Sequence, residues 1–530
     1  MPFLPTAGNL LWGAASLAGW RRHRVALRDP AVAQQRLLTG YLRDNADTVV
    51  GRAYGFSSIR SVAEYQARVP ISTFDSIEPL VRRVARGEAD ILTRARVQRL
   101  VPSSGSTSAV KLVPYTRTLQ HEISRAVDAW IADLYLGCSS LIGGPAYWSI
   151  TPAAGSKRPF LEDEPSVGRS ATEADTPIPV GFDDDSSYLG GLRTVLARAV
   201  MAVPPAVRLN EDLAEFQRAT LVYLLLAREL RLVSVWHPSF LSALLDALAC
   251  QWPALIDRIT RADTARASEL RRFRPDDISR IWPRLRLISC WGDGPARPHA
   301  AELATRVPGI TIQPKGLLAT EGVVTIPFRG RHPVAVGSHF FEFLSPAGRP
   351  LLVHELHPGV EYSTILTTGG GLYRYHLADR VIVDGVVDRT PSLTFVGKDD
   401  RVSDRFGEKL SDGFVASVLN QLFAPPLSRP RFAMLAPDEG PSGTCYTLFV
   451  DGHTAPLSGL DAPLEAALRS NPHYAWCVDV GQLRPARVQR VGQGADRAYV
   501  DFCVAQGQRL GDVKPVSLHP GTGWANVLPC

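Results

Sequence analysis

A phosphate-binding loop is the first site that residue types and spacing indicate, at residues 103–111. Five hydroxyl side chains and one glycine fill residues 103–108, and Lys111 follows three residues later. Such a stretch suits neither a core helix nor a core strand, but its backbone N–H and hydroxyl groups can turn inward around an anion, to which Lys111 would add a point charge. The residues that would grip the phosphates are Ser103, Ser104, Gly105, Ser106 and Thr107.

The segments on both sides of this loop argue for a binding site and against a linker. Clusters of Ser, Thr and Gly are most often solvated linkers. Here an apolar strand is predicted at 97–101, a second short strand at 112–115, and a helix at 116–136 with Thr116 or Thr118 as its N-cap. A linker needs no such apolar neighbours. The loop is also not a Walker loop, because Lys111 comes six residues after the glycine.

Two carboxylates elsewhere in the chain are candidate site residues. Glu321 lies between stretches predicted to form strands at 310–312 and 323–326, and a carboxylate there is costly unless something pairs with it. Asp379 belongs to the stretch L-Y-R-Y-H-L-A-D-R-V that begins at residue 372. A surface salt bridge with the neighbouring Arg380 is the simplest alternative for Asp379.

Three motifs carry a resemblance to a known family. The stretch S-S-G-S-T-S-x-x-K-x-V-P-Y-T at 103–116 resembles the first signature of adenylate-forming enzymes, in a form that looks like the GH3 family of acyl-acid amido synthetases. The stretch 315–322 resembles the second signature, although Leu317 or Leu318 stands where an aromatic residue is common. The stretch 373–381 resembles the third signature, with Ala378 in place of the customary glycine. Further segments look like bacterial members, so the resemblance covers nearly the whole chain.

The resemblance implies an AMP-forming ligase that uses ATP and Mg²⁺. It implies that the loop hydroxyls hold phosphates, that Glu321 orients magnesium, and that Asp379 accepts two hydrogen bonds from the ribose. Lys409 would offset charge on the substrate carboxylate and the α-phosphate, with Lys111 as a second candidate. Besides the loop, the residues that the resemblance places at the nucleotide are Thr320, Glu321, Tyr375, Asp379 and Lys409.

Length and motifs together predict an α/β protein of two unequal domains. The larger, residues 1–408, would bind ATP and the acyl acid with mixed β-sheets, flanking helices and a β-barrel-like part. The smaller, residues 409–530, would be a mobile α+β lid with its hinge near 407–414, where Gly407 permits backbone rotation. In the lid we expect helices at 415–422 and 464–468 and strands at 446–450 and 497–504.

Two segments are expected to shape the larger domain. Stretches at 340–344, 351–355 and 362–367 read as strands with short connections, so we expect antiparallel pairing. The stretch 237–240 follows another predicted strand. In the GH3 family this region lines the acyl pocket, whereas a helix start with Ser239 as N-cap accounts for the same residues without a ligand.

Charge and cysteine content indicate which kinds of binding partner and which cellular compartment to expect. The net charge of +6 is scattered and not clustered, so we expect no nucleic-acid partner. Seven dispersed cysteines indicate a reducing cytoplasm. The apolar stretch 8–20 is too short to span a bilayer and precedes its basic run, so an amphipathic first helix is expected and not a signal peptide or membrane anchor. We expect a monomer or weak dimer that acts on a small carboxylic acid and an amine or amino acid.

Three other functions stay open at this point. A thioester-forming ligase would share the activation step and transfer the acyl group to coenzyme A. A nucleotide-binding module without turnover would need the loop but not Glu321, Asp379 and Lys409 together. A hydrolase fits least, because no G-x-S-x-G elbow stands beside a plausible histidine.

Overall fold

The computed structural model describes most of the chain as two compact units. Its described residues run from 3 to 529 except for 103–110, 150–177, 183–187, 189, 211, 399–401, 404, 407, 425–429, 441–442, 452–456, 458, 480–481, 507 and 509–512. The first unit comprises Met1–Leu377 and Ile382–Thr394, and the second comprises Ala378–Val381 and Phe395–Cys530. The contact-based boundary thus falls at residue 395. The hinge near 407–414 and the division at 408 stay predictions, because compactness does not show where a chain bends.

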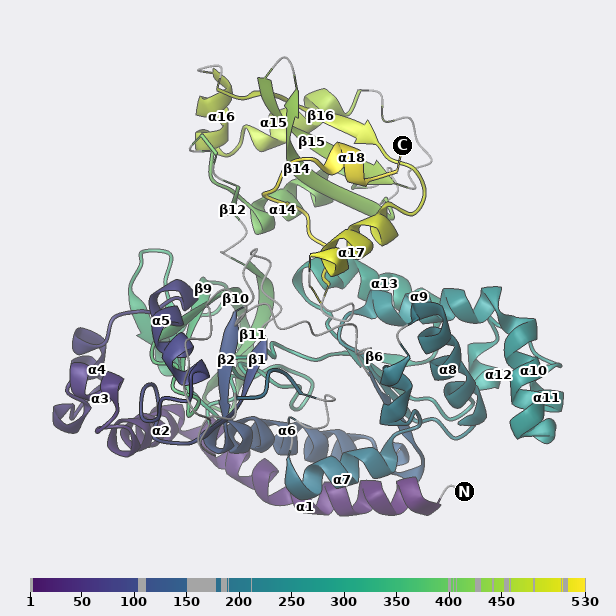
Figure 1. Ribbon diagram of the computed structural model, residues 1–530, viewed down its shortest axis with the longest axis horizontal. Coiled ribbons are helices and arrows are strands. Elements are labelled where there is room, and N and C mark those ends of the chain that lie inside the picture. Colours follow the sequence, from purple (N-terminus) through teal and green to yellow (C-terminus); the bar gives the residue numbers. More distant parts are fainter. Residues whose placement is uncertain are drawn as a thin grey trace, which may run out of the picture. The chain divides into compact units, whose positions relative to one another are not determined.

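The first unit begins with helices that pack on one another (Figure 1). Helix α1 (Phe3–Arg28) lies along α6 (Arg117–Gly137) and α7 (Gly191–Val200). The amide nitrogen of Asn9 donates to the carbonyl oxygen of Gly144 at 2.8 Å. The amide oxygen of Asn9 accepts a hydrogen bond from the Tyr135 hydroxyl at 2.7 Å. The expected first helix packed on the body is therefore confirmed. Shorter helices follow it: α2 (Pro30–Asp44), α3 (Val49–Ala53), α4 (Val62–Arg68) and α5 (Phe74–Ala85).

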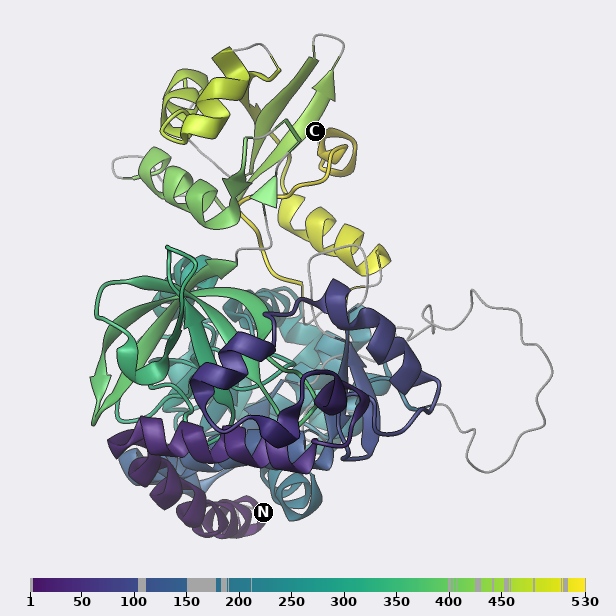
Figure 2. The ribbon, with the colours of Figure 1, turned by 90° about the vertical axis from the view of Figure 1, so that its left-hand side faces the viewer.

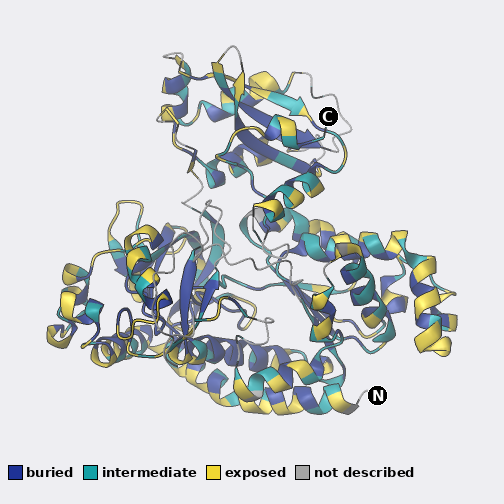
Figure 3. Ribbon diagram, in the orientation of Figure 1, coloured by how far each residue is buried: buried dark blue, intermediate teal, exposed yellow. Residues whose placement is uncertain are grey.

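A buried hairpin flanks the predicted phosphate loop. Strands β1 (Val97–Pro102) and β2 (Leu112–Thr116) pair antiparallel, with Pro102 opposite Leu112. Figure 3 shows β2 as buried along its whole length, and Tyr115 of β2 lies in one apolar cluster with Leu119 and Ile123 of α6. The Thr116 hydroxyl accepts from the Leu119 backbone N–H at 3.1 Å and so caps α6. Both predicted strands and the helix are confirmed, with Thr116 as the cap.

A parallel sheet forms the second part of the first unit. Its order is β3-β4-β5-β6, and its strands are β3 (Ala146–Trp148), β4 (Leu232–Ser234), β5 (Leu287–Cys290) and β6 (Thr311–Pro314). An apolar cluster packs these strands against six helices: α8 (Leu213–Leu226), α9 (Pro238–Cys250), α10 (Trp252–Ala262), α11 (Thr264–Leu270), α12 (Ile278–Ile281) and α13 (Arg297–Arg306).

Among the described helices, none alone is long and apolar enough to cross a membrane. The pair α9 and α10 has sufficient length and composition only when taken together, and it bends by 84° at the break. Its buried leucines and isoleucines belong to the apolar cluster of the parallel sheet.

The third part is a five-stranded sheet in the order β11-β10-β9-β7-β8. Its strands are β7 (Phe340–Leu344), β8 (Pro350–Leu352), β9 (Glu361–Thr367), β10 (Tyr375–Val387) and β11 (Thr390–Lys398). Strand β7 pairs antiparallel with both β8 and β9, as the short connections predicted. The strand expected at 323–326 is wrong. That stretch makes isolated bridges at Val323 and Thr325 in place of a regular ladder.

The second unit is an α+β domain with a three-stranded sheet, β14 (Phe432–Gly440), β15 (Gly443–Asp451) and β16 (Arg484–Arg490). Figure 2 shows helices on both faces of this sheet. Leu435 and Leu448 pack against α14 (Asp412–Leu422), α15 (Asp461–Leu468) and α16 (Pro472–Asp479), whereas Met434 and Phe449 pack against α17 (Ala495–Ala505) and α18 (Trp524–Val527). A short ladder of β12 (Val402–Ser403) and β13 (Leu410–Ser411) precedes α14.

The strand predicted at 497–504 is wrong, because these residues lie in helix α17. Val500, Phe502 and Val504 alternate as in a strand, but the buried positions are Ala495, Tyr499 and Cys503. Their spacing of four residues puts them on one face of a helix that packs against Trp524. The α/β class with several mixed sheets and a small α+β unit is otherwise confirmed.

Candidate active site

Of the predicted phosphate loop, Lys111 lies among the described residues. It is half-buried and directly precedes β2. Ser103, Ser104, Gly105, Ser106 and Thr107 lie outside them. What the structure shows of this site is its support, the pairing of β1 with β2 that holds residues 102 and 112 opposite each other.

Glu321 sits at the tip of a tight reversal formed by residues 316–325. The backbone N–H groups of Ala319 and Gly322 each donate to the other residue's carbonyl oxygen, at 3.0 and 3.2 Å. Gly316 has φ 76°, and a Cβ there would lie 2.7 Å from Thr325 Oγ1, so glycine is required. The Glu321 side chain is 8% exposed, while the neighbouring Thr320 is half-buried. Glu321 is therefore buried, and its role at the metal stays a prediction.

A histidine lies directly beneath this tip. The backbone N–H of Val323 donates to Nε2 of His339 at 3.0 Å, and His339 is fully buried. A Cβ on Gly322 would lie 2.9 Å from the same nitrogen, so the backbone rests against the imidazole ring. The residue two positions after Glu321 is thereby fixed to the core.

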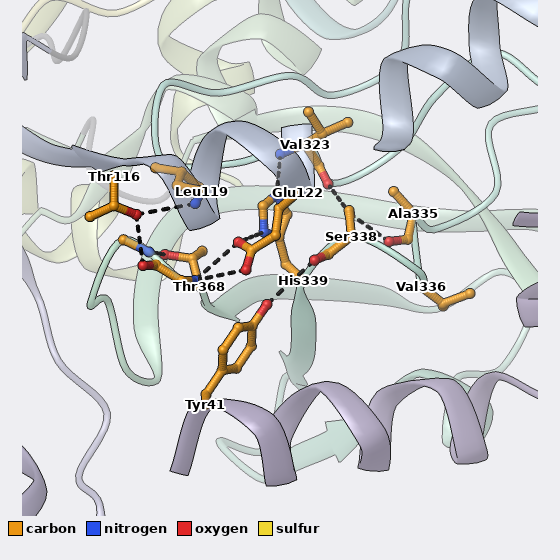
Figure 4. Close-up of polar contacts among 12 residues, drawn as sticks. Tyr41, Thr116, Leu119, Glu122, Val323, Ala335, Val336, Ser338, His339 and Thr368 are labelled. Atoms are coloured by element: carbon orange, nitrogen blue, oxygen red, sulfur yellow. Dashed lines mark hydrogen bonds and ion pairs between the residues drawn. The ribbon is translucent and has the colours of Figure 1, made fainter. Parts of the chain in front are cut away.

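Glu122 of α6 continues the contact from the other side of the ring (Figure 4). Its Oε2 lies 3.0 Å from Nδ1 of His339, and both carboxylate oxygens accept from the Gly369 backbone N–H, at 3.2 and 3.0 Å. The hydroxyl of Thr116 donates to the Gly369 carbonyl oxygen at 2.9 Å. One network therefore joins the strand after the phosphate loop, the Glu321 reversal and the turn before Tyr375.

Burial and the negative charge of Glu122 both raise the pKa of two neighbouring tyrosines. Burial, and after it the negative charge of Glu122, raises the pKa of Tyr41 well above its usual value. The same two causes raise the pKa of Tyr373. The positive charge of Arg125 acts on Tyr41 in the opposite direction. Burial and the neighbouring carboxylate therefore both disfavour ionisation of the two phenols.

The segment around Tyr375 is held by buried polar contacts on its own side. Arg374 makes a two-pronged ion pair with Glu342, with both nitrogen–oxygen distances 3.0 Å, and it donates to the Val69 carbonyl oxygen at 2.7 Å. Ser72 exchanges backbone hydrogen bonds with Arg374 and His376. Tyr375 is 3% exposed. The arginine of the third motif is thus a structural residue that anchors the strand.

Asp379, in the second unit, is buried and paired. Its side chain is 3% exposed, and Nζ of Lys398 lies 3.1 Å from its Oδ1. The alternative of an exposed salt bridge to Arg380 is therefore wrong, because the Asp379 side chain is buried and pairs with Lys398 on β11. Ala378 has φ 58°, a left-handed conformation that costs an ordinary residue about 1–2 kcal/mol. This explains why glycine suits the position.

Lys409 carries an exposed side chain on a constrained backbone. Its φ is 46°, and its carbonyl oxygen accepts from the Asn471 amide at 3.3 Å. The preceding Glu408 is fully buried and accepts from the backbone N–H groups of Arg405 and Phe406, at 3.0 and 2.8 Å. The buried carboxylate of Glu408 thus anchors the backbone just before Lys409.

Aromatic and basic side chains gather at the carboxyl ends of the parallel strands, where open α/β sheets bind ligands. The rings of Trp236 and Trp291 have centroids 5.6 Å apart, and Nζ of Lys315 lies 4.5 Å from the Trp236 centroid. Lys315 is 3% exposed. The helix cap predicted at Ser239 is wrong. Nδ1 of His237 accepts from the Ser239 backbone N–H at 3.2 Å, so His237 is the cap.

Within the described residues, no group of three or more His, Cys, Asp or Glu side chains could hold a metal ion by itself. Mg²⁺ is usually held by one or two carboxylates together with substrate phosphates. The single buried carboxylate of Glu321 fits a magnesium ion of that kind and does not fit a metal held by protein ligands alone.

Comparison with known families decides what this arrangement belongs to. The GH3 family N-terminal domain matches residues 21–312, and the GH3 family central domain matches residues 333–398. The chain belongs to the GH3 family. The N-terminal match alone covers more than half of the 530 residues.

Relatives of this GH3 protein include plant enzymes of low sequence identity. A probable indole-3-acetic acid-amido synthetase of Oryza sativa subsp. japonica is 23% identical, over 70% of this chain and 69% of the relative. A jasmonoyl-L-amino acid synthetase of Nicotiana attenuata is 24% identical, with the same coverage of both chains. The solved structure of the acyl acid amido synthetase AtGH3.15 in complex with 2,4-DB is 16% identical, has a TM-score of 0.81, and covers 97% of this chain and 96% of its own.

The roles predicted for the site residues stay predictions, and the structure adds two buried residues that the sequence did not reveal. Glu321, Tyr375 and Asp379 are buried as expected of functional carboxylates and their neighbours. Glu122 and His339 were not predicted, because 217 residues separate them. A glutamate on the apolar face of helix 116–136, beside Leu119 and Ile123, was the one signal in the sequence.

Proposed function

We propose that this GH3 protein uses ATP to convert a carboxylic acid to an acyl-adenylate and then transfers the acyl group to an amine or amino acid. The products would be an amide, AMP and pyrophosphate. The observation that carries the proposal is the end-to-end likeness in fold to an acyl acid amido synthetase, over 97% of this chain, combined with family membership. The relatives' named activities support the same class.

In the first step an oxygen of the acid would attack the α-phosphorus of ATP, and the bond to the β-phosphate would break to release pyrophosphate. Two anions must approach each other, so the protein has to hold both and neutralise charge. The loop from Ser103 to Thr107 would hold the phosphates, with Lys111 as the adjacent cation. Glu321 would hold a magnesium ion, which when bound would supply positive charge against the phosphates.

The second unit would supply a ribose contact and a mobile cation. Asp379 is buried beside Lys398, and we assign its remaining acceptor capacity to the ribose hydroxyls. Thr320 and Tyr375, in the first unit, would lie beside the nucleotide. Lys409 projects from a rigid backbone into solvent, as a group that acts in one orientation of a lid must do.

In the second step the nitrogen of the amine would attack the acyl carbon. The bond between that carbon and the adenylate oxygen would break, AMP would leave, and the nitrogen would lose a proton to solvent. The adenylate makes this possible because AMP is a far better leaving group than an oxide. We further propose that the reaction takes place in the cytoplasm, and the six described cysteines, which are all free, are in keeping with that compartment.

The proposal is tested by exchange of labelled pyrophosphate into ATP. We expect exchange that depends on a carboxylic acid and on Mg²⁺, and that needs no amine. Candidate acids should span aromatic and short aliphatic compounds, because the structure does not name the acid. Exchange that proceeds equally without any acid, or nucleotide binding without exchange across the whole panel, would contradict an adenylating enzyme.

A further inference from the structure

Glu122 and His339 are buried ionisable residues to which the proposed mechanism gives no role. The Glu122 side chain is 1% exposed and the His339 side chain is 0% exposed. Burying such groups is costly unless each of their polar atoms is paired. The hydrogen bonds of the pair reach Val323 and Gly369, which belong to segments that the proposed function needs, and Figure 4 shows the polar contacts around the pair.

The hydrogen bonds fix the tautomer of His339. The backbone N–H of Val323 can only donate, so Nε2 of His339 must accept and carries no proton. The proton of the neutral imidazole then lies on Nδ1, which donates to Oε2 of Glu122 at 3.0 Å. A doubly protonated ring would set two donors against each other at Nε2. Glu122, as a carboxylate, accepts both this bond and the one from Gly369.

Each end of the pair accepts a hydrogen bond from a backbone amide of another segment. Val323 follows the tip that carries Glu321. Gly369 opens the turn that leads to Tyr375, and a Cβ there would lie 2.5 Å from Glu122 Oε1. Thr116, which starts α6 and ends β2, fixes the carbonyl oxygen of the same glycine.

We propose that Glu122 and His339 form a positioning unit that aligns the magnesium-binding carboxylate Glu321 with the Gly369–Tyr375 segment. The inference rests on the proposed function, because it assigns a purpose to the place of Glu321. The hydrogen bonds run from the Val323 backbone N–H to Nε2 of His339, and from Nδ1–H of His339 to the Glu122 carboxylate. A shift at any member moves the Glu321 tip. Contacts that orient a metal ligand typically change metal affinity or activity by about 10–100-fold when removed.

Glu122→Gln perturbs these contacts without removing volume. If the amide nitrogen of glutamine faces His339, the ring must move its proton to Nε2 and then opposes the Val323 N–H. If the amide nitrogen takes the place of Oε1, it opposes the Gly369 N–H, while the remaining oxygen still accepts from His339 and Gly369. We expect the Mg²⁺ concentration for half-maximal pyrophosphate exchange to rise by about 10–100-fold. Amide hydrogen exchange at Val323 or Gly369, followed with selective ¹⁵N labels, should also accelerate.

Two substitutions of His339 separate positioning from mere packing. In His339→Gln the side chain can still accept from Val323, so Mg²⁺ dependence should stay near that of the unaltered protein. In His339→Asn the side chain can donate to Glu122 but cannot reach Val323, so the magnesium requirement should rise. Asp128→Asn is the matched control, because Asp128 is a buried carboxylate on the same helix that pairs with Arg193. It should leave the magnesium requirement unchanged.

The outcomes distinguish this inference from the proposed function. A ¹⁵N spectrum of the unaltered protein that shows the His339 proton on Nε2 would overturn the positioning unit, and so would equal effects of the Gln and Asn variants at this residue. If the unaltered protein shows no acid-dependent exchange, the proposed function fails. The ¹⁵N spectrum of His339 and the hydrogen exchange rates of the Val323 and Gly369 amides would still show whether the pair holds these segments.

Discussion

Nζ of Lys398 lies 3.1 Å from Oδ1 of Asp379, and the Asp379 side chain is almost fully buried. The carboxylate that we assign to the ribose is thus already anchored by a cation from the neighbouring strand. A buried carboxylate needs such a partner to stay charged. It also has two oxygens with about four acceptor sites, so the ion pair leaves capacity for a ligand. Two substitutions can tell these roles apart.

Asp379→Ala should weaken ATP binding by about ten- to more than a hundredfold. Hydrogen bonds to a charged group contribute about 1.5–3 kcal/mol each, which corresponds to that range of affinity. Lys398→Met is the control, because it breaks the ion pair and keeps the carboxylate. Isothermal titration with ATP measures both. Should Asp379→Ala lower thermal stability as Lys398→Met does while ATP affinity stays unchanged, Asp379 would be a structural residue alone.

Lys409→Ala should lower the rate of adenylation by about 10²–10³ with a much smaller effect on ATP affinity. A group that reaches the reacting centre in one domain orientation acts on the transition state more than on ground-state binding. Single-turnover kinetics separates the two quantities. Lys111→Ala is measured in parallel, since either lysine could neutralise the reacting anions. Loss of ATP affinity with normal turnover would make Lys409 a nucleotide clamp.

Local patterns predicted much of this fold. The apolar spacing of residues 119–134 gave a helix, and α6 spans Arg117–Gly137. The alternation of apolar residues at 497–504 wrongly predicted a strand, because the two faces of helix α17 both contain apolar residues. The strands on either side of the predicted phosphate loop were predicted one by one, and their antiparallel pairing, with Pro102 opposite Leu112, comes from the structure.

The site was predictable only where a segment carries its own motif. Glu321 and Asp379 were recognised from their neighbours in sequence, and both are buried. The partner of Asp379 was not, because Lys398 follows in another strand of the sheet. The Glu122–His339 contact joins a helix to a residue next to β7, so it exists only once tertiary packing has brought them together. Periodicity cannot reveal such a pair.

His23 should make the folded state sensitive to acid. Burial lowers the pKa of His23 from 6.5 to about 4, and its ring packs edge-on against Phe328 at 4.9 Å between centroids. The unfolded chain therefore binds a proton at higher pH than the folded chain. No cost arises above pH 6.5, and the loss of stability grows as pH falls from 6.5 to 4, to about 3 kcal/mol.

His23→Phe should reduce the loss of stability at acidic pH, when the free energy of unfolding is measured between pH 4 and 8. The phenyl ring keeps the packing against Phe328 and has no proton to gain. The exposed His121 offers the control, and His121→Gln should leave the pH profile as it is. If the free energy of unfolding falls equally with pH in His23→Phe and in the unaltered protein, other groups cause the loss of stability in acid.

The acceptor of the acyl group should be an amine and not coenzyme A. Coenzyme A carries three phosphates and normally requires clustered basic residues. In the described part of the second unit, several arginines are instead engaged with carboxylates: Arg405 with Glu439, Arg431 with Asp496, Arg469 with Glu465 and Asp479, and Arg487 with Asp438. An amino acid needs a site for one carboxylate, which a single arginine can grip with two hydrogen bonds.

With an acid that supports pyrophosphate exchange, AMP release should therefore accelerate when amino acids are supplied and stay at its basal rate with coenzyme A. The decisive measurement is product detection by mass spectrometry across the twenty amino acids, with coenzyme A in a parallel reaction. An amide identifies the acid and the amine together, because both parts are present in its mass. A thioester as the sole product would instead make the chain an acyl-coenzyme A ligase on a GH3 fold, and the paired arginines of the second unit would then have to release their carboxylates to bind the phosphates.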